Sequence, residues 1–288
     1  MSEALPLNET EFPDLDLLRE KARRIRCDAL WMAHLSNSGH VGGSLSCADI
    51  VATLYFGIMR LRPQEPRWPD RDRFIMSKGH TCSAWYSALA EKGYFPREEL
   101  LTYRKLGSRL QGHPDMAKLP GIEMTAGSLG HGLAGGLGMA LAGKLDKRDY
   151  RVYVLLGDGE SQEGLIWETA LSAPNLGVDN LIAILDNNGM QSGGAVRNIM
   201  PLGDVADKWR SFGWDVWTVD GHDIPSLVEV FRRAPRKPGV PTFVLCNTVK
   251  GKGVSFMEND NVWHGKAPDR EQLDQALEEI GCKGVRFP

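Results

Sequence analysis

The chain has 288 residues, of which 42% are hydrophobic and 25% are charged, a composition typical of a globular protein with a large core. Its formal net charge of −3 gives no general electrostatic reason to bind nucleic acid or an anionic membrane, so we expect neither partner. The longest run of small apolar residues, from Leu133 to Gly143, is interrupted by glycines and is too short for a transmembrane helix.

The N-terminal segment 1–13 is acidic and has no apolar core, so we expect a loose arm and neither a signal peptide nor a mitochondrial presequence. Residues 14–288 are expected to form one α/β domain. The cysteines are odd in number, widely spaced and without a C-x-x-C pair, which predicts reduced thiols and a cytoplasmic protein. They are Cys27, Cys47, Cys82, Cys246 and Cys282.

In the first third of the chain, two histidines lie in loops next to predicted helices and a predicted strand. The predicted elements are helices over 15–36, 47–58, 81–92 and 96–106 and a strand over 73–77. The glycine-rich loop 37–43 carries His40, and the turn after the strand carries His80. An imidazole beside a helix N-terminus is well placed for an anion.

A glycine-rich stretch from Gly130 to Gly135 matches the pattern G-x-G-x-x-G. It is a weak dinucleotide fingerprint, because residues 121–127 before it do not form a convincing buried strand. The small residues through Gly143 instead predict a closely packed helix.

The centre of the chain predicts two neighbouring strands that each end in polar residues. An apolar run over 152–156 leads into Gly157-Asp158-Gly159, Ser161 is a candidate N-cap for a helix that ends near Pro174, and a second apolar strand over 181–185 ends in Asp186-Asn187-Asn188. The 27 residues between Gly159 and Asn187 leave room for one crossover helix, so the two strands should run parallel in one sheet. Their polar ends would then meet.

This edge is predicted to hold a metal ion and a diphosphate. Carboxylate and amide oxygens of Asp158 and Asn188 suit Mg²⁺ or Ca²⁺, with a backbone carbonyl, water and phosphate oxygens completing the shell. Gly157 and Gly159 allow the backbone to approach a diphosphate closely. The alternative interpretation is an ordinary turn between strand and helix, followed by a polar loop.

The last third predicts further α/β units and two polar loops. The predicted elements are helices over 205–212, 224–233 and 269–280 and strands over 215–219 and 242–246. Lys250 and Lys252 each precede a glycine but lack the spacing of a P-loop.

Four histidines of the chain lie in glycine-rich loops, and together they suit binding of diphosphate oxygens, proton transfer and binding of sugar hydroxyls. They are His40, His80, His113 and His264, whereas His34 and His222 are interpreted as structural or surface residues.

Seven of these loops, in chain order, resemble the transketolase family of thiamine diphosphate enzymes. They read SGHVGGS, SKGH, QGHPD, GSLGHG, GDGESQEG, NNGMQ and WHG, and they extend over nearly the whole chain. The resemblance implies an α/β thiamine diphosphate-binding fold with a mostly parallel sheet and helices on both faces. It also implies reversible transfer of a two-carbon ketol unit from a ketose phosphate to an aldose phosphate, within the pentose phosphate pathway.

The resemblance implies a role for each matching residue. Metal ligands would be Asp158, Asn188 and the Met190 carbonyl, holding Mg²⁺ with Ca²⁺ or Mn²⁺ as possible substitutes. Thiamine diphosphate would be bound by His80, Gly127, Ser128, Leu129, Gly159, Asn188 and His264. Catalytic residues would be His40, His113 and His264, together with Glu163 at a subunit interface. Val41 in place of proline and His131 in place of glutamine depart from the family pattern and concern substrate positioning.

Family enzymes carry a pyrimidine-binding domain and a C-terminal domain after this region. The resemblance therefore implies the N-terminal subunit of a split transketolase, with a C-terminal partner subunit in an α2β2 heterotetramer, acting on sugar phosphates. Three alternatives stay open: a specialised sugar-catabolic ketolase or synthase subunit, the α subunit of a 2-oxo acid dehydrogenase, and a non-catalytic binding subunit. SGHVGGS, SKGH and WHG argue against the dehydrogenase.

Overall fold

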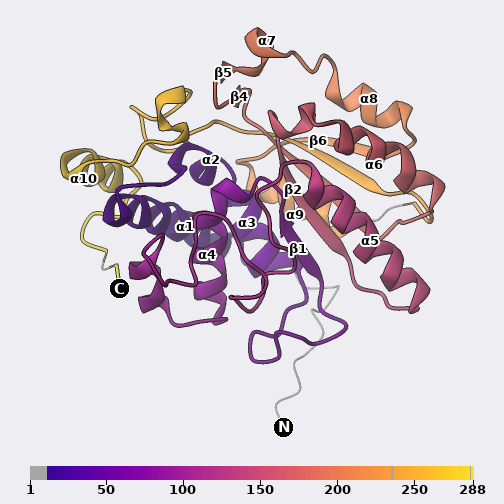
Figure 1. Cartoon of the computed structure of the whole chain (residues 1–288), viewed down its shortest axis with the longest axis horizontal. Coiled ribbons are helices and arrows are strands. Elements are labelled where there is room, and N and C mark those ends of the chain that lie inside the picture. The colour runs from indigo at the N-terminus through magenta and orange to yellow at the C-terminus, as the bar shows by residue number, and fades with distance from the viewer. Residues whose placement is uncertain (1–11, 235–236, 286) are drawn as a thin grey trace.

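A five-stranded parallel sheet forms the centre of the protein, in the computed structural model that describes residues 12–234, 237–285 and 287–288 (Figure 1). The strand order is β1-β2-β3-β7-β6. The strands are β1 (Arg73–Met76), β2 (Val152–Gly157), β3 (Leu181–Asn187), β6 (Asp215–Asp220) and β7 (Thr242–Asn247). The predicted α/β fold with a mostly parallel sheet is confirmed, and β2 and β3 are adjacent with Gly157 opposite Asp186.

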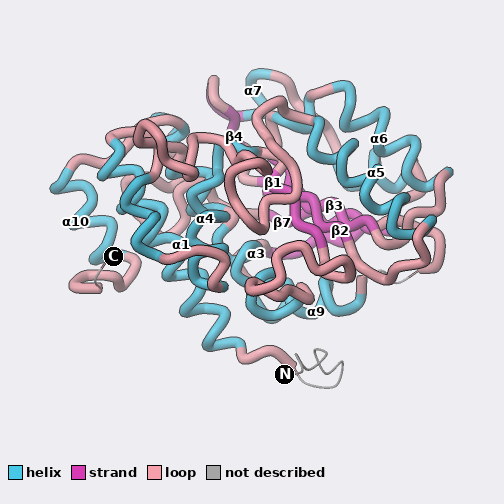
Figure 2. Tube along the Cα trace, turned by 60° about the horizontal axis from the view of Figure 1, so that its bottom comes forward, coloured by secondary structure: helices cyan, strands magenta, loops and turns pink. Residues whose placement is uncertain are grey.

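Helices cover both faces of the sheet (Figure 2). One face packs against α1 (Leu15–Ser36), α3 (Ala48–Thr53), α4 (Cys82–Lys92) and α9 (Ile224–Arg233). The other packs against α5 (His131–Leu145), α6 (Gly164–Asn175) and α8 (Val205–Ser211). Because successive strand side chains point to opposite faces, Tyr153 and Leu155 of β2 enter the first core and Val152 and Val154 enter the second.

A third, smaller core lies outside the sheet. There the far side of α1 packs against α2 (Val41–Ser46) and α10 (Arg270–Glu279). Local sequence explains the ends of these helices: the Asp14 carboxylate accepts N–H bonds from the first turn of α1, Asn37 ends that helix in the left-handed conformation, and Asp269 forms a capping box with Gln272. α1 is thus shared between two cores.

Three local expectations were wrong. Residues 41–46 are helical and not part of a loop, because packing against α1 and α4 buries every residue of this segment. The predicted helix over 96–106 is a 3₁₀ helix over Arg97–Thr102, which we call η3. Ser161 does not cap α6, since it lies in the 3₁₀ turn Glu160–Gln162 and its hydroxyl donates to the Gly157 carbonyl, which leaves Glu163 at the N-cap position.

Short elements complete the chain. They are a π-helical turn at Leu54–Ile58, 3₁₀ turns at Gly79–Thr81 and Asn261–His264, the hairpin of β4 (Met190–Gln191) with β5 (Gly194–Ala195), and α7 (Val196–Ile199). The predicted arm over 1–13 falls almost wholly outside the described residues. No helix within the described residues is long and apolar enough to cross a membrane.

The cysteines differ from expectation at one pair. Cys27 of α1 and Cys282, just after α10, form a disulfide, although 255 positions separate them in sequence. Cys47, Cys82 and Cys246 are free, as predicted, and all three are buried. The prediction of five reduced thiols was therefore wrong for two, because the packing of α10 against α1 brings distant positions together.

Close packing of α5 on the sheet generates the first prediction. A Cβ at Gly132 would lie 2.3 Å from Ser77 Oγ and 2.9 Å from its Cα, whereas a Cβ at Gly138 of the same helix meets nothing within 4 Å. We expect Gly132→Ala to lower the free energy of unfolding by about 1–3 kcal/mol through overpacking. Gly138→Ala should raise it by about 0.5–1 kcal/mol, since alanine is the better helix former.

Urea denaturation of both variants measures these changes. Equal stability of the two would show that α5 does not approach β1 as closely as described.

Candidate active site

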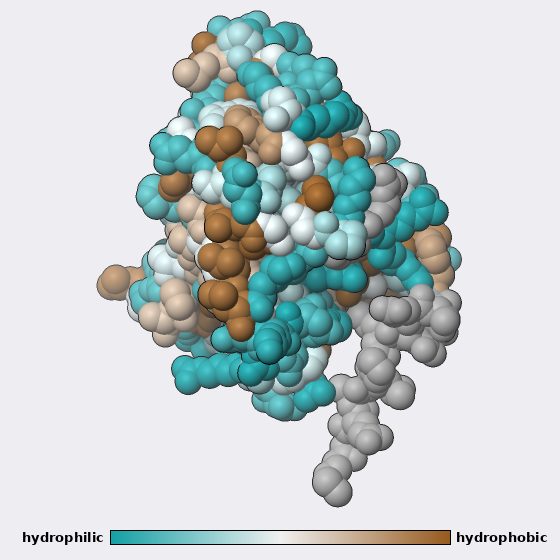
Figure 3. Space-filling model, turned by 90° about the vertical axis from the view of Figure 1, so that its right-hand side faces the viewer, coloured by the Kyte–Doolittle hydropathy of each residue, from teal (hydrophilic) through white to brown (hydrophobic). Residues whose placement is uncertain are grey.

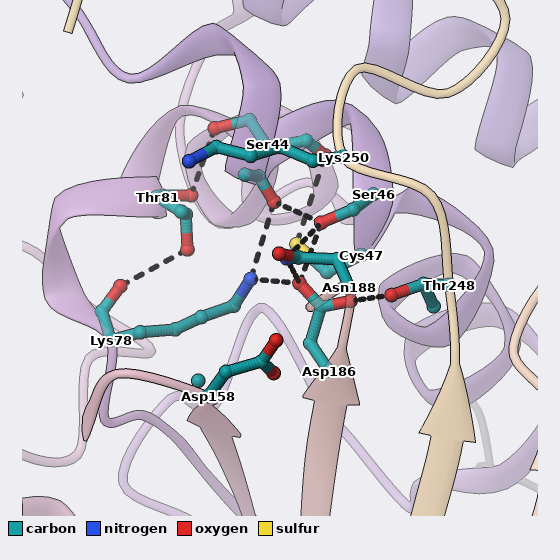
Figure 4. Close-up of polar contacts among 12 residues, drawn as sticks. Ser44, Ser46, Cys47, Lys78, Thr81, Asp158, Asp186, Asn188, Thr248 and Lys250 are labelled. Carbon is teal, nitrogen blue, oxygen red and sulfur yellow. Dashed lines mark hydrogen bonds and ion pairs between the residues drawn. The ribbon is translucent and has the colours of Figure 1, made fainter. Parts of the chain in front are cut away.

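Polar side chains from neighbouring strands meet at the C-terminal edge of the sheet (Figure 4). Asp158 follows β2, and Asp186 and Asn188 lie at the end of β3. The Gly189 N–H donates to Asp158 Oδ2, and the Met190 N–H donates to Asn188 Oδ1 at 3.1 Å. The loop after β3 is therefore folded onto the turn after β2, which is the juxtaposition that the spacing of the two motifs predicts.

The Asp158 carboxylate has the environment of a cation ligand. Its Oδ1 atom is buried and has no hydrogen-bond partner within the described chain. Burial is the main cause that raises the pKa of Asp158 to about 7, and the neighbouring Asp186 carboxylate acts in the same direction. A divalent ion would neutralise this carboxylate and use its free oxygen, so the donor set fits the metal that the fold family implies.

A buried lysine keeps Asp186 ionised. Lys78 Nζ forms an ion pair with Asp186, which also accepts hydrogen bonds from Ser46, Thr248 and Asn188. Although burial acts in the opposite direction, the Lys78 charge and these donors hold the pKa of Asp186 below its usual range. The bond from Asn188 Nδ2 to Asp186, at 3.2 Å, leaves the amide oxygen of Asn188 turned away from Asp186.

Three of the four loop histidines form a compact cluster. The ring centroids of His40, His80 and His264 lie 5.1–5.4 Å apart. Burial lowers the pKa of both His40 and His264 to about 4, and neighbouring cations and imidazoles add to this effect. Burial likewise holds the pKa of His80 well below 6.5. All three rings are neutral near pH 7.

A second lysine orients one of these rings. Lys250 Nζ lies 3.0 Å from His264 Nδ1 and 3.2 Å from Asn261 Oδ1. Burial lowers the pKa of Lys250 to about 8, so the ammonium form still predominates at pH 7 and donates to the imidazole. His264 therefore carries its own proton on Nε2, where it can donate to a ligand.

The remaining predicted residues line the loops around this cluster. His113 is exposed, and a Cβ at Gly127 would lie 3.6 Å from its ring, so a larger side chain at 127 would crowd the imidazole. Ser128 is exposed and Leu129 half-buried, just before α5. Gly159 packs so closely on Gln191 that a Cβ there would lie 2.9 Å from the Gln191 Cβ.

Two acids of the GDGESQEG motif have different environments. Glu163 is exposed at the start of α6 beside Gly130, and no described residue forms an ion pair with it. Glu160 is buried, accepts N–H bonds from Gly130 and Gly157, and binds the Ser77 hydroxyl. Glu160 thus joins the turns after β1 and β2 to the start of α5.

Sequence reasoning missed Lys78, Glu160, Asp186 and Lys250 as members of the site. A signal existed for Lys78 and Asp186, because each is a charged residue at the C-terminal end of an apolar strand: Lys78 follows β1 by two residues, and Asp186 lies near the end of β3. His34 and His222 lie outside the cluster, as predicted: His34 Nδ1 contacts the Pro268 carbonyl at 3.0 Å, and His222 Nδ1 contacts Asp49 at 2.8 Å.

Several known proteins are similar to this chain in sequence and in fold. The family described as transketolase, thiamine diphosphate binding domain, matches residues 18–287. The chain is 43% identical over 266 residues to one of the subunits of apulose-4-phosphate transketolase from Phocaeicola vulgatus, covering 92% of this chain and 93% of that one. It is 46% identical over 247 residues to the SqwG subunit of 6-deoxy-6-sulfo-D-fructose transketolase from a Clostridium species, covering 86% and 90%.

Longer relatives match over less than half of their length. The structure of transketolase from Campylobacter jejuni superposes with a TM-score of 0.90 at 31% identity, covering 96% of this chain and 45% of that one. Human transketolase is 39% identical over 269 residues, which is 42% of its length.

The neutral imidazoles generate a prediction for the protein freed of metal and cofactor. Because the pKa of His40 and His264 is about 4 when folded and about 6.5 when unfolded, the unfolded chain binds more protons between these values. This contribution to stability is complete above pH 6.5 and is lost as the pH falls toward 4. Because both rings are partly exposed, solvent screening reduces the contribution of each pKa shift, and replacing both residues by glutamine should still reduce that loss by at least about 1 kcal/mol.

Urea denaturation at about pH 7 and at about pH 4.5, on either side of the unfolded histidine pKa, measures the difference. His131→Gln, at an exposed position, is the control and should keep the wild-type dependence. If the double variant showed the same pH dependence as wild type, the two rings would not be neutral as described.

Proposed function

Because the chain belongs to the transketolase family and spans its thiamine diphosphate-binding domain, we propose that it is the N-terminal subunit of a transketolase built from two polypeptides. The reaction is reversible transfer of a two-carbon ketol unit between sugar phosphates. The observation that carries the proposal is the buried Asp158 oxygen beside Asn188, which has no hydrogen-bond partner among the described residues. Two lysines and three neutral imidazoles lie next to it.

Asp158, the Asn188 amide oxygen and the Met190 carbonyl would hold Mg²⁺, for which Ca²⁺ or Mn²⁺ are possible substitutes. Lys78 and Lys250 place positive charge at the edge where a diphosphate would lie, and His80 and the Nε2–H of His264 add donors. Thiamine diphosphate supplies, when bound, the carbon–carbon bond chemistry that protein side chains lack. The protein residues hold and orient it.

The neutral imidazoles suit the handling of sugar hydroxyls. A neutral ring both donates and accepts, so His40, His113 and His264 can bind hydroxyls and move protons without a charged resting state. His40 Nδ1 is buried without a partner within the described residues, which leaves this atom free to bind a ligand. Charged rings would instead repel Lys78 and Lys250.

The partner would cover an apolar face of α5 and α6. Figure 3 shows a band of hydrophobic surface on the side of the protein that carries these helices. Leu145 is 75% exposed, Leu171 55% and Leu176 46%, on the same pair of helices as the exposed Glu163. The single-chain relatives are more than twice as long as the matched region, and the relatives of similar length are named as subunits. We assign this face to the C-terminal subunit, in an α2β2 assembly with Glu163 at the contact.

The relatives suggest two candidate classes of sugar substrate. Two relatives that match over most of both chains are named for apulose-4-phosphate and for 6-deoxy-6-sulfo-D-fructose, which favours a specialised sugar-catabolic transketolase as a second candidate. A general role in the pentose phosphate pathway, in the cytoplasm, is the first. Comparing ketol transfer from a common pentulose phosphate with transfer from these sugars separates the two.

The decisive experiment copurifies the native complex and assays ketol transfer with added Mg²⁺ and thiamine diphosphate. We expect activity in the complex, none in this chain alone, and a loss of at least about 100-fold in an Asp158→Asn complex, because the variant removes the charged metal ligand. Asp149→Asn is the control, since Asp149 is an exposed acid at the opposite end of β2. Full activity of this chain alone, or of the Asp158→Asn complex, would refute the proposal.

A further prediction concerns the apolar face. Leu171→Glu should weaken association with the partner by about tenfold or more, because a charge would be buried in the contact. Leu17→Glu on α1, where the leucine is 44% exposed, is the matched control and should associate normally. Equal association of the two variants in sedimentation or pull-down titrations would move the contact elsewhere.

A further inference from the structure

Arg104 is a cation with an unusual backbone in the loop after η3. Its φ is +59°, in the left-handed region, which costs a residue with a side chain about 1–2 kcal/mol. Its N–H donates to the Leu110 carbonyl at 2.8 Å, closing the loop between them. The backbone at this position is therefore held in a conformation that arginine does not favour.

The guanidinium of Arg104 touches two loops that are far apart in sequence. Nη1 donates to the Ser38 hydroxyl, two residues before His40. The group also lies against Gly112, the residue before His113, where a Cβ would come within 2.4 Å of Nη2 and 2.7 Å of Nε. A side chain at 112 would therefore displace the guanidinium, and one arginine side chain connects the loops that carry two of the histidines.

The positive charge of this guanidinium has no carboxylate partner among the described residues, although the group lies over the Tyr103 ring, 5.8 Å from the ring centroid. Nε is buried without a hydrogen-bond partner, and no described carboxylate lies within ion-pair distance of the group. By contrast, Arg97 and Arg109 on either side of it pair with Asp28 and Glu99. A buried N–H without a partner costs about 1–3 kcal/mol, so two local costs coincide at one residue. Strain concentrated in this way is typical of functional positions.

The charge of Arg104 also acts on the rings. Burial is the main cause that lowers the pKa of His113, and the Arg104 charge adds to it; for His40 the same holds, with His264, His113 and Lys250 acting in the same direction. His80 is a further titratable group here, since its ring centroid lies 5.1 Å from that of His40. Arg104 thus favours neutral imidazoles in both loops.

We propose that Arg104 is a positioning residue that fixes the Ser38–His40 loop against the Gly112–His113 loop and so places His40 and His113 for the sugar substrate. The contacts with Ser38 and Gly112 carry this inference. It rests on the proposed function only for the identity of the ligand as a sugar. The spacing of the two imidazoles follows from the structure alone.

Three variants test the proposal. Arg104→Met removes both the charge and the contacts, Arg104→Lys keeps the charge but loses the planar fork, and Gly112→Ala displaces the guanidinium from the other side. Arg109→Met is the control, because Arg109 lies nearby but pairs with Glu99. Histidine titration by NMR on this chain alone and kinetics of the partner complex are the two measurements.

The variants should distinguish the effect of the Arg104 charge on the pKa of His113 from the effect of its contacts on substrate binding. In the isolated chain, the pKa of His113 should rise in Arg104→Met and change little in Arg104→Lys or Arg109→Met. In the complex, KM for the sugar should rise about tenfold or more in Arg104→Met, Arg104→Lys and Gly112→Ala, because small displacements of substrate-binding groups are costly. Thiamine diphosphate affinity should stay within about twofold of wild type, since the contacts of Arg104 are with Ser38 and Gly112 and not with the residues assigned to the metal or the diphosphate.

Two results would overturn the proposal: wild-type KM in both Arg104→Lys and Gly112→Ala, or an unchanged titration of His113 in Arg104→Met. The NMR result does not depend on ketol transfer. A failure of the proposed function, with no activity in any complex, would therefore be distinguishable from a failure of this inference.

Discussion

The site depends on two carboxylates, Asp158 and Asp186, placed at the ends of adjacent parallel strands and buried together. Like charges in a poorly solvated position repel strongly, so such a pair persists only if a cation or a proton neutralises at least one member. Lys78 forms an ion pair with Asp186, and Asp186 also accepts hydrogen bonds from three further donors. Asp158 keeps an oxygen that has no hydrogen-bond partner among the described residues, and this asymmetry is why we propose Asp158 and not Asp186 as the metal ligand.

The rest of the fold holds this edge in place. A parallel sheet covered on both faces sends several strand ends to one edge, and the turns there can approach one another only where side chains are small. Gly132 lets α5 lie against Ser77, while Glu160 joins the turn after β2 to the start of the same helix. The same close contacts thus pack the helix against the sheet and fix the geometry of the site.

Nearby positive charges also help to determine the protonation states of the histidines. Lys78 and Lys250 help to keep the adjacent imidazoles neutral, Lys250 gives His264 a defined tautomer, and Arg104 favours neutral rings in the loops of His40 and His113. A site rich in cations and neutral donors suits an anionic cofactor and a polyhydroxylated substrate. The exposed apolar face of α5 and α6, with Glu163 nearby, suits the polypeptide that would complete the site.

Strands β2 and β3, their parallel pairing and the contact of Asp158 with the loop of Asn188 could be predicted, because apolar runs, turn residues and the length of a crossover are local signals. The motifs also identified the family. The contact of Lys250 with His264, the link that Arg104 makes between two histidine loops and the Cys27–Cys282 disulfide could not be predicted in this way. Each of these contacts depends on how whole elements and loops pack against one another, which no local pattern encodes.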